Sequence, residues 1–264
     1  MAPMSKEDLW KEWLDQCDHW EKIYRWSRCT GLAYAESIAE WIVQNIDSIK
    51  LQTEGLRDRS FRSMHFGQAK LKDDNKETNE KMLCRAAFNQ RYIDGLGVVL
   101  DYELPLKEIR GAGHGDVDLV CLRENRLLCV EVKRFNSCES ALKGLIEAFV
   151  YSRLLQRKIE QLRKDFYLNK EVTIQPVYLT FPEAKSYEQL ISLPERSKIP
   201  ELIEAMNRKL KEERIEPIQL KCGTINGEYC GSPWDRLSYL EEDQTYLIRF
   251  KANVSLSTET IKLG

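Results

Sequence analysis

Two strand-like runs joined through a two-residue turn constrain the fold of this chain more than any other feature. The runs cover residues 116–122 and 127–134, and Glu124-Asn125 between them has the length of a tight hairpin turn. This spacing predicts an antiparallel pair of strands. In that register Arg123 faces Arg126, Asp118 faces Glu131, and Asp116 faces Lys133.

Both faces of this hairpin are rich in apolar side chains. Because side chains alternate along a strand, the four charged residues of the pairs share one face. Toward the turn, that face continues with Val120, Leu122, Leu127 and Cys129. The other face carries Val117, Leu119, Cys121, Leu128, Val130 and Val132. We therefore expect both faces to be largely buried, with charge gathered at one end of one face.

The charged end of the hairpin needs a physical explanation. A solvated end with one salt bridge between Asp116 and Lys133 is the plain structural interpretation. It leaves Asp118 and Glu131 facing each other, which is destabilising without a compensating cation. A hard divalent cation such as Mg²⁺ prefers carboxylate oxygens and would supply the compensation.

The surrounding pattern predicts the order αβββαβ. A helix starts near residue 78 or 79 and ends near Tyr92, and a strand follows over 98–104, with Leu100, Tyr102 and Leu104 expected on one face. The hairpin comes next, then a helix over about 139–156 and a strand over 172–180. The fold class is therefore α/β with a mixed sheet.

The flanking regions read as extensions of this core. Residues 1–75 are predicted to be helical up to about residue 50 and then polar and linker-like. Residues 184–264 form an α/β extension with a helix near 199–213 and strands near 215–221 and 245–255. Asn226-Gly227 there is a strong hairpin signal. The core is expected over 76–183, and the C-terminal extension either continues it or stands apart.

Several functional classes are excluded by composition. No uninterrupted apolar run exceeds four residues, so a transmembrane helix is not expected. The first residues lack the apolar stretch of a signal peptide, so we expect a cytoplasmic protein. No pair of the 8 cysteines has C-x-x-C spacing, which argues against a zinc ribbon. With 40 Lys+Arg against 42 Asp+Glu, the net charge of −2 excludes a uniformly basic coat.

At the charged end, the sequence resembles the PD-(D/E)XK superfamily of restriction-endonuclease-like nucleases. The matching residues are Asp118, Glu131 and Lys133, placed on consecutive strands within αβββαβ, and Val117 stands where the motif has proline. The resemblance covers residues 79 to about 180. It implies hydrolysis of phosphodiester bonds in DNA, or alternatively RNA, by a metal-activated water.

The resemblance also implies particular roles. Asp118, Glu131 and the backbone carbonyl of Val132 would bind Mg²⁺, for which Mn²⁺ would substitute. Lys133 would orient the water and stabilise the transition state. Glu80 in the first core helix matches an additional acidic metal ligand of the family, with Glu77 as the alternative.

A second motif points to the RecB-like branch of the superfamily. That branch carries Gln-x-x-x-Tyr in the helix after the Glu-x-Lys strand, and Glu147 and Tyr151 match it with Glu in place of Gln. The four-residue spacing places both on one helical stripe. His65 and His114 are interpreted as ordinary loop residues.

A nuclease also needs cationic contacts to phosphates. Arg110 and Arg134 near the site are the first candidates, followed by Lys143 and Arg153 in the next helix. The chain would act alone, as a homodimer, or within a larger nucleic-acid-processing complex. Two alternatives stay open: a catalytically silent module of the same fold, and a protein–protein module built on the aromatic N-terminal helices.

Overall fold

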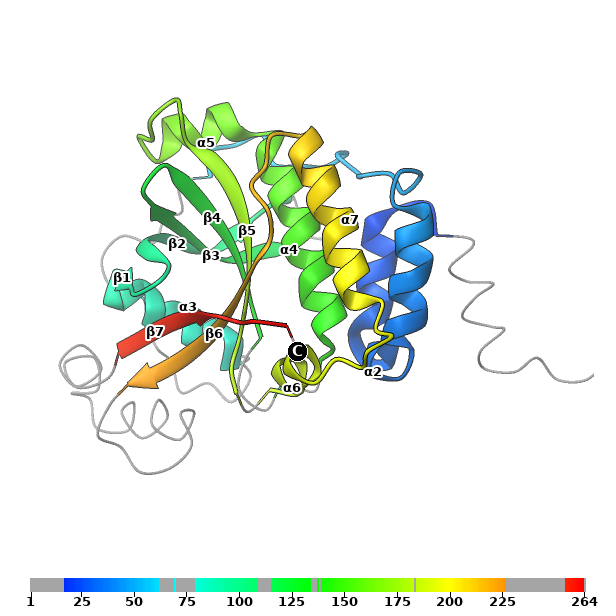
Figure 1. Ribbon diagram of the computed structural model, residues 1–264. Helices are drawn as coiled ribbons and strands as arrows, with labels where there is room; N and C mark the ends of the chain where they lie inside the picture. Colours follow the sequence, from blue (N-terminus) through cyan, green and yellow to red (C-terminus); the bar gives the residue numbers. More distant parts are fainter. Residues whose placement is uncertain are drawn as a thin grey trace, which may run out of the picture.

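The computed structural model describes residues 17–61, 69, 79–108, 115–133, 137, 139–182, 184–226 and 255–263. These residues build a mixed α/β fold around one seven-stranded sheet (Figure 1). In chain order the strands are β1 (Tyr92–Ile93), β2 (Gly97–Pro105), β3 (Asp116–Arg123), β4 (Arg126–Val132), β5 (Thr173–Thr180), β6 (Gln219–Asn226) and β7 (Ser255–Thr260).

The order of the strands in the sheet follows their order in the chain. The pairs from β1 to β4 are antiparallel, β4–β5 and β5–β6 are parallel, and β6–β7 is antiparallel. The sheet also curves back on itself, because Asp94 after β1 bridges to Ser257 of β7. The Gln90 side chain strengthens this closure by donating to the Leu256 carbonyl and accepting from the Leu256 N–H.

Helices cover both faces of the sheet. In chain order they are α2 (Trp20–Asn45), α3 (Asn79–Gln90), α4 (Ala141–Gln156), α5 (Ile159–Asp165), α6 (Lys185–Ile191) and α7 (Ile199–Glu212). Helix α3 packs against β1, β2 and β3, whereas α4 packs against β4 and β5. Helices α2 and α7 lie against the outer side of α4, which is therefore enclosed between the sheet and two helices (Figure 1).

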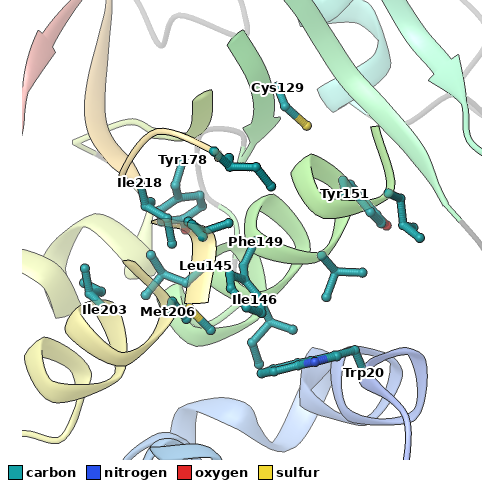
Figure 2. Packing of buried hydrophobic residues seen from close by; sticks show 14 of the residues in the cluster. Trp20, Cys129, Leu145, Ile146, Phe149, Tyr151, Tyr178, Ile203, Met206 and Ile218 are labelled. Atoms are coloured by element: carbon teal, nitrogen blue, oxygen red, sulfur yellow. The ribbon is translucent and has the colours of Figure 1, made fainter. Parts of the chain in front are cut away.

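The enclosure of α4 explains its apolar sequence. Trp20 of α2 meets Phe149 of α4 edge-to-face, with 5.0 Å between ring centroids. Figure 2 shows Trp20 on one side of α4, with Tyr178 and Cys129 of the sheet on the other. Gly144 permits the close approach of α4 to β5, because a Cβ there would lie 2.1 Å from the Tyr178 ring.

The predicted order αβββαβ appears as α3, β2, β3, β4, α4 and β5, with the short β1 added before β2 and the short α5 added before β5. The hairpin register is confirmed from Arg123–Arg126 through Leu119–Val130. Its two apolar faces are confirmed as well, since they enter two separate hydrophobic clusters, with Val117 as the exception. Val117 packs in the cluster on the α4 side instead of the cluster on the α3 side.

One local prediction is wrong, and two others fall mostly outside the described residues. Leu104 packs toward α4 and Tyr102 toward α3, because a bulge near Leu100 and a left-handed Glu103 (φ 47°) interrupt the alternation of β2. The last strand that the structure describes covers 255–260, and most of the strand expected near 245–255 lies outside the described residues. Thr224 and Ile225 pair with that strand, and the residues after Asn226 that the expected hairpin also needs lie outside the described residues.

The segment expected to be a linker is docked where the structure describes it. Leu56 and Phe61 are buried in the same cluster as α2 and α4. The Phe61 N–H donates to the Asp165 carboxylate at 2.6 Å, which ties the segment to the end of α5. Across the described helices, none combines the length and hydropathy needed to cross a bilayer.

Candidate active site

The candidate site begins where the β3–β4 ladder ends. The last ladder pair is Leu119–Val130. If the antiparallel ladder continued beyond this pair, the Val132 N–H would donate to a carbonyl of β3. Here the Val132 N–H donates instead to the Asp118 carboxylate at 2.7 Å. The two strands part at this point, and the Asp118 side chain turns in toward β4.

This parting corrects the expected pairing at the charged end. Asp118–Glu131 and Asp116–Lys133 are not pairs of the observed ladder. Asp116 lies opposite Pro105 of β2, and its carboxylate is 3.5 Å from the Lys107 ammonium. The salt bridge between Asp116 and Lys133 considered from the sequence is therefore absent among the described ion pairs.

Lys133 is the centre of a buried charge cluster. Strand β5 holds its backbone, since the Lys133 N–H donates to the Leu179 carbonyl at 2.8 Å. The Lys133 ammonium contacts three carboxylates and its side chain is 3% exposed. Their distances from the ammonium nitrogen are 2.7 Å for Glu131, 3.0 Å for Glu147 and 3.2 Å for Glu139. The ammonium donates a hydrogen bond to Glu131 Oε1, whereas Glu147 Oε2 lies within ion-pair distance but has no hydrogen-bond partner among the described residues.

Electrostatics at the site are dominated by burial. Asp118 keeps some solvent exposure, but protein atoms surround it closely, and this burial raises its pKa to about 7 against the opposing effect of Lys133. Burial also raises the pKa of Glu131 well above its ordinary value, and nearby Asp118 adds to the shift. Both carboxyl groups therefore favour a proton or a metal ion over a bare negative charge.

The pKa values of Lys133 and Glu139 shift in the directions that favour ion pairing. Burial alone would lower the pKa of Lys133, but the surrounding carboxylates, Glu131 first, raise it well above its ordinary value. Burial alone would raise the pKa of Glu139, but Lys133 and Lys143 hold it below its ordinary value. The carboxylates around Lys133 therefore favour its charged form.

Glu80 lies on the α3 side of the site. It is half-buried in the first turn of α3, and its charge contributes to the raised pKa values of both Asp118 and Lys133. The predicted helix position thus brings Glu80 within electrostatic range of the strand carboxylates. Glu77, the alternative, lies outside the described residues.

The predicted helical stripe of Glu147 and Tyr151 meets the strands. Glu147 reaches Lys133, as described above, and its side chain is 8% exposed. The Tyr151 hydroxyl lies next to Gly115 at the start of β3, where an added Cβ would be only 2.1 Å from the oxygen. Gly115 is required here because the tyrosine hydroxyl fills the space of a side chain.

Glu139 is part of the site although no sequence argument singled it out. Its carboxylate contacts Lys133 at 3.2 Å and Lys143 at 2.8 Å. A signal was present in the sequence, because Glu139, Lys143, Glu147 and Tyr151 follow one another at four-residue spacing. That spacing predicts a shared stripe but does not show that the stripe faces Lys133.

The residues expected to contact phosphates are placed differently from one another. Lys143 is 11% exposed and paired with Glu139 and Glu147. Arg153 is 6% exposed, with its Nε 2.9 Å from the Glu213 carboxylate and its guanidinium over the Phe149 ring. Both are therefore engaged within the protein. Arg110, Arg134, His65 and His114 lie outside the described residues.

The donor set suits a hard cation coordinated partly by water. No cluster of three or more His, Cys, Asp or Glu side chains in the described ranges is arranged to hold a metal ion. Mg²⁺, however, is usually bound through one or two carboxylates and keeps several waters. Glu131 Oε2 is buried and has no hydrogen-bond partner among the described residues. This oxygen, the Asp118 carboxylate and the Val132 carbonyl fit such an ion.

The chain was compared with protein-family models, curated proteins and solved structures. No protein-family model, no curated protein and no solved structure matches the chain.

Proposed function

We propose that this chain is a metal-dependent nuclease with a restriction-endonuclease-like core of the PD-(D/E)XK type. The observation that carries the proposal is the meeting of Asp118, Glu131 and Lys133 where strands β3 and β4 part. The order α3, β2, β3, β4, α4, β5 also supports it, because it agrees with the αβββαβ core expected from the resemblance.

In this proposal Asp118 and Glu131 bind Mg²⁺ together with the Val132 carbonyl, and Glu80 is the additional acidic group. The ion would lower the pKa of a bound water and offset charge on the phosphate. The Val132 N–H fixes the Asp118 carboxylate at 2.7 Å, so this ligand is oriented before any ion arrives.

Lys133 would stabilise the negative charge that develops on the phosphate. Release of one of its three carboxylate neighbours would leave more of its charge for the phosphate. Glu139 is the partner that the geometry favours for release, because it makes the longest contact and has Lys143 as a second cation at 2.8 Å. Glu147 would then keep the lysine oriented.

A cleavage assay tests the proposal. The full chain is incubated with supercoiled plasmid, single-stranded DNA and RNA in Mg²⁺, in Mn²⁺ and in EDTA. We expect cleavage of at least one nucleic acid with either metal and none in EDTA. Asp118→Asn should reduce the rate by about 10²–10³, as for other preorganised charged groups.

The matched control is Asp47→Asn. Asp47 is 81% exposed and paired with Lys209, far from β3 and β4 in the sequence. It should leave the cleavage rate unchanged. Wild-type cleavage by Asp118→Asn, or cleavage that persists in EDTA, would refute the metal-dependent nuclease.

One observation favours a second candidate, a catalytically silent binding module of the same fold. The buried Lys133 ammonium already contacts three carboxylates, as expected if the cluster only stabilises the fold. The same assay separates the two candidates. A silent module would bind nucleic acid or a protein partner without metal-dependent cleavage.

A further inference from the structure

A second site lies at the opposite end of the sheet. A pocket of about 800 Å³ that is largely open to solvent is lined by the last turns of α7, the connection after it and the start of β5. Its volume is in the range of small-molecule binding sites. Thr173 in its wall stands five residues before Tyr178, the β5 partner of Glu131. That separation is roughly 16 Å along the strand. In Figure 1 this end of α7 is orange and lies away from α6.

Three cations line this cavity: Arg208, Lys211 and Arg214. Within the described chain none of them forms an ion pair. Other cations of the same helix are paired, since Lys198 contacts Glu201, and Lys209 contacts both Asp47 and Glu212. The unpaired cations of α7 are thus the ones that face the cavity.

The wall also holds groups for the uncharged part of a ligand. Pro217 offers an exposed apolar surface, whereas Ile215 is buried in the core. Asn207 has a fixed orientation, because its side-chain oxygen accepts the Ile218 N–H at 2.8 Å, and its amide nitrogen remains as a donor. Two acidic residues, Glu204 and Glu216, leave the wall with one net positive charge.

Arg214 occupies a position where glycine would be more stable. Arg214 follows Glu213, the C-cap residue of α7, and its own φ of 60° lies in the left-handed region. The Ile215 N–H donates to the Leu210 carbonyl at 3.0 Å and the Arg214 N–H to the Lys211 carbonyl at 3.1 Å, which forms a Schellman motif. A side chain at such a position is unfavourable. Here it places a guanidinium beside the cavity.

We infer that this cavity binds a phosphate-bearing ligand of nucleotide size. Arg208, Lys211 and Arg214 hold the phosphate, because guanidinium groups match its oxygens and the ammonium adds charge. The ring portion lies against Pro217. The ligand is either a free mononucleotide or a nucleotide within a strand, and the site functions independently of Asp118 and Glu131.

Calorimetry with the full chain tests this inference, using AMP, inorganic phosphate, adenosine, a short single-stranded DNA and an oligoglutamate peptide, all in EDTA. We expect AMP or the DNA to bind, with adenosine much weaker. Preference for AMP identifies a free nucleotide as the ligand, and preference for the DNA identifies a strand. Tightest binding of oligoglutamate, or equal binding of AMP and adenosine, overturns the inference.

Arg214→Gly separates binding from folding. Because glycine relieves the left-handed conformation, this variant should melt at a higher temperature than wild type. It should nevertheless bind AMP or DNA about tenfold more weakly. Lys209→Gln, which removes a paired cation of the same helix, should bind as wild type does. Unchanged binding by Arg214→Gly, or no binding by wild type, refutes the site.

Failure of this inference is distinguishable from failure of the nuclease. Asp118→Asn should lose cleavage and still bind AMP or DNA at α7. Arg214→Gly should retain metal-dependent cleavage of a substrate present at saturating concentration.

Discussion

Helix α4 takes part in two buried charge clusters that differ in their balance of charge. Near its first turns, Glu139, Lys143 and Glu147 meet Glu131 and Lys133, with three acids to two bases. Near its last turns, Arg153 and Arg157 share one acid, Glu213. We call these the first-turn cluster and the last-turn cluster.

The comparison distinguishes a structural ion pair from a candidate active site. In the last-turn cluster, the single carboxylate is matched by two arginines, and that is sufficient to bury it. In the first-turn cluster the carboxylates exceed the lysines, and the neighbouring Asp118 and Glu80 add further negative charge. Such an excess in a buried place is costly unless a cation or protons balance it. The imbalance is therefore what suggests a metal site.

The largest expected effect comes from removing the central lysine of the first-turn cluster. Lys133→Met should reduce metal-dependent cleavage by about 10²–10³, because a fixed positive charge near the phosphate is lost. Initial rates at saturating Mg²⁺ measure this effect. Lys198→Met, which removes a half-exposed lysine paired with Glu201, is the matched control and should cleave normally. A rate within twofold of wild type for Lys133→Met would remove Lys133 from the mechanism.

Removing the acid of the last-turn cluster should reduce stability and leave cleavage unchanged. Glu213→Ala leaves Arg153, which is 6% exposed, without its carboxylate. The free energy of unfolding should fall by up to about 3 kcal/mol, the lower end for a broken buried pair. Urea denaturation measures this change, and Glu201→Ala at an exposed pair should cost less than about 0.5 kcal/mol.

The cleavage rate of folded Glu213→Ala should equal that of wild type. If this variant lost cleavage while retaining its stability, the division between the two clusters would be wrong.

The excess of carboxylates predicts a pH-dependent stability in the absence of metal. The folded pKa of Asp118 is about 7, above the ordinary value of 3.8. Between these values the folded state holds a proton that the unfolded state has released, so the unfolding free energy falls as pH rises. In EDTA the melting temperature should therefore be lower at pH 8 than at pH 5.5, by about 2–4 °C for each kcal/mol lost.

Two further measurements sharpen this prediction. Asp118→Asn should flatten the decline of melting temperature with pH, since the titrating carboxyl group is gone. Mg²⁺ should raise the melting temperature of wild type more at pH 8 than at pH 5.5, because protons compete for the same oxygens. A melting temperature that rises between pH 5.5 and pH 8 in EDTA would contradict the raised pKa.

The smallest expected effect concerns the start of α4. Ser140 caps this helix, and its hydroxyl accepts the Lys143 N–H at 3.4 Å. Ser140→Ala should lower the unfolding free energy by about 0.5–1 kcal/mol, because a helix N–H loses its partner. Chemical denaturation measures the loss, and Ser192→Ala near the end of α6 is a control for removal of a serine hydroxyl. A loss above 2 kcal/mol would mean that the cap also positions the first-turn cluster.

Several features of the site were predictable because they depend on neighbouring residues. The two-residue turn at Glu124-Asn125 sets the register of β3 and β4, so the pairing up to Leu119–Val130 followed from spacing alone. Alternation assigned most of the hairpin side chains to their faces. The four-residue spacing of Glu147 and Tyr151 likewise predicted their common stripe.

Other features required contacts between distant segments. Arg153 was expected to contact phosphate, but its partner Glu213 lies 60 residues later, brought close by the packing of α7 on α4. Glu139 was missed because its importance depends on how α4 lies against β4. The bulge in β2 broke an alternation that looked regular in the sequence.

The sequence by itself therefore determined the hairpin, its register and the presence of Asp118, Glu131 and Lys133 at one end of it, since turn length and side-chain alternation act over a few residues. Only the tertiary structure decided that the strands part at Asp118 and that Lys133 is surrounded by three carboxylates. Those outcomes depend on β5 holding the Lys133 backbone and on α4 placing two acids beside it. The free energy of burying charge depends on every group that surrounds it, and most of those groups come from elsewhere in the chain.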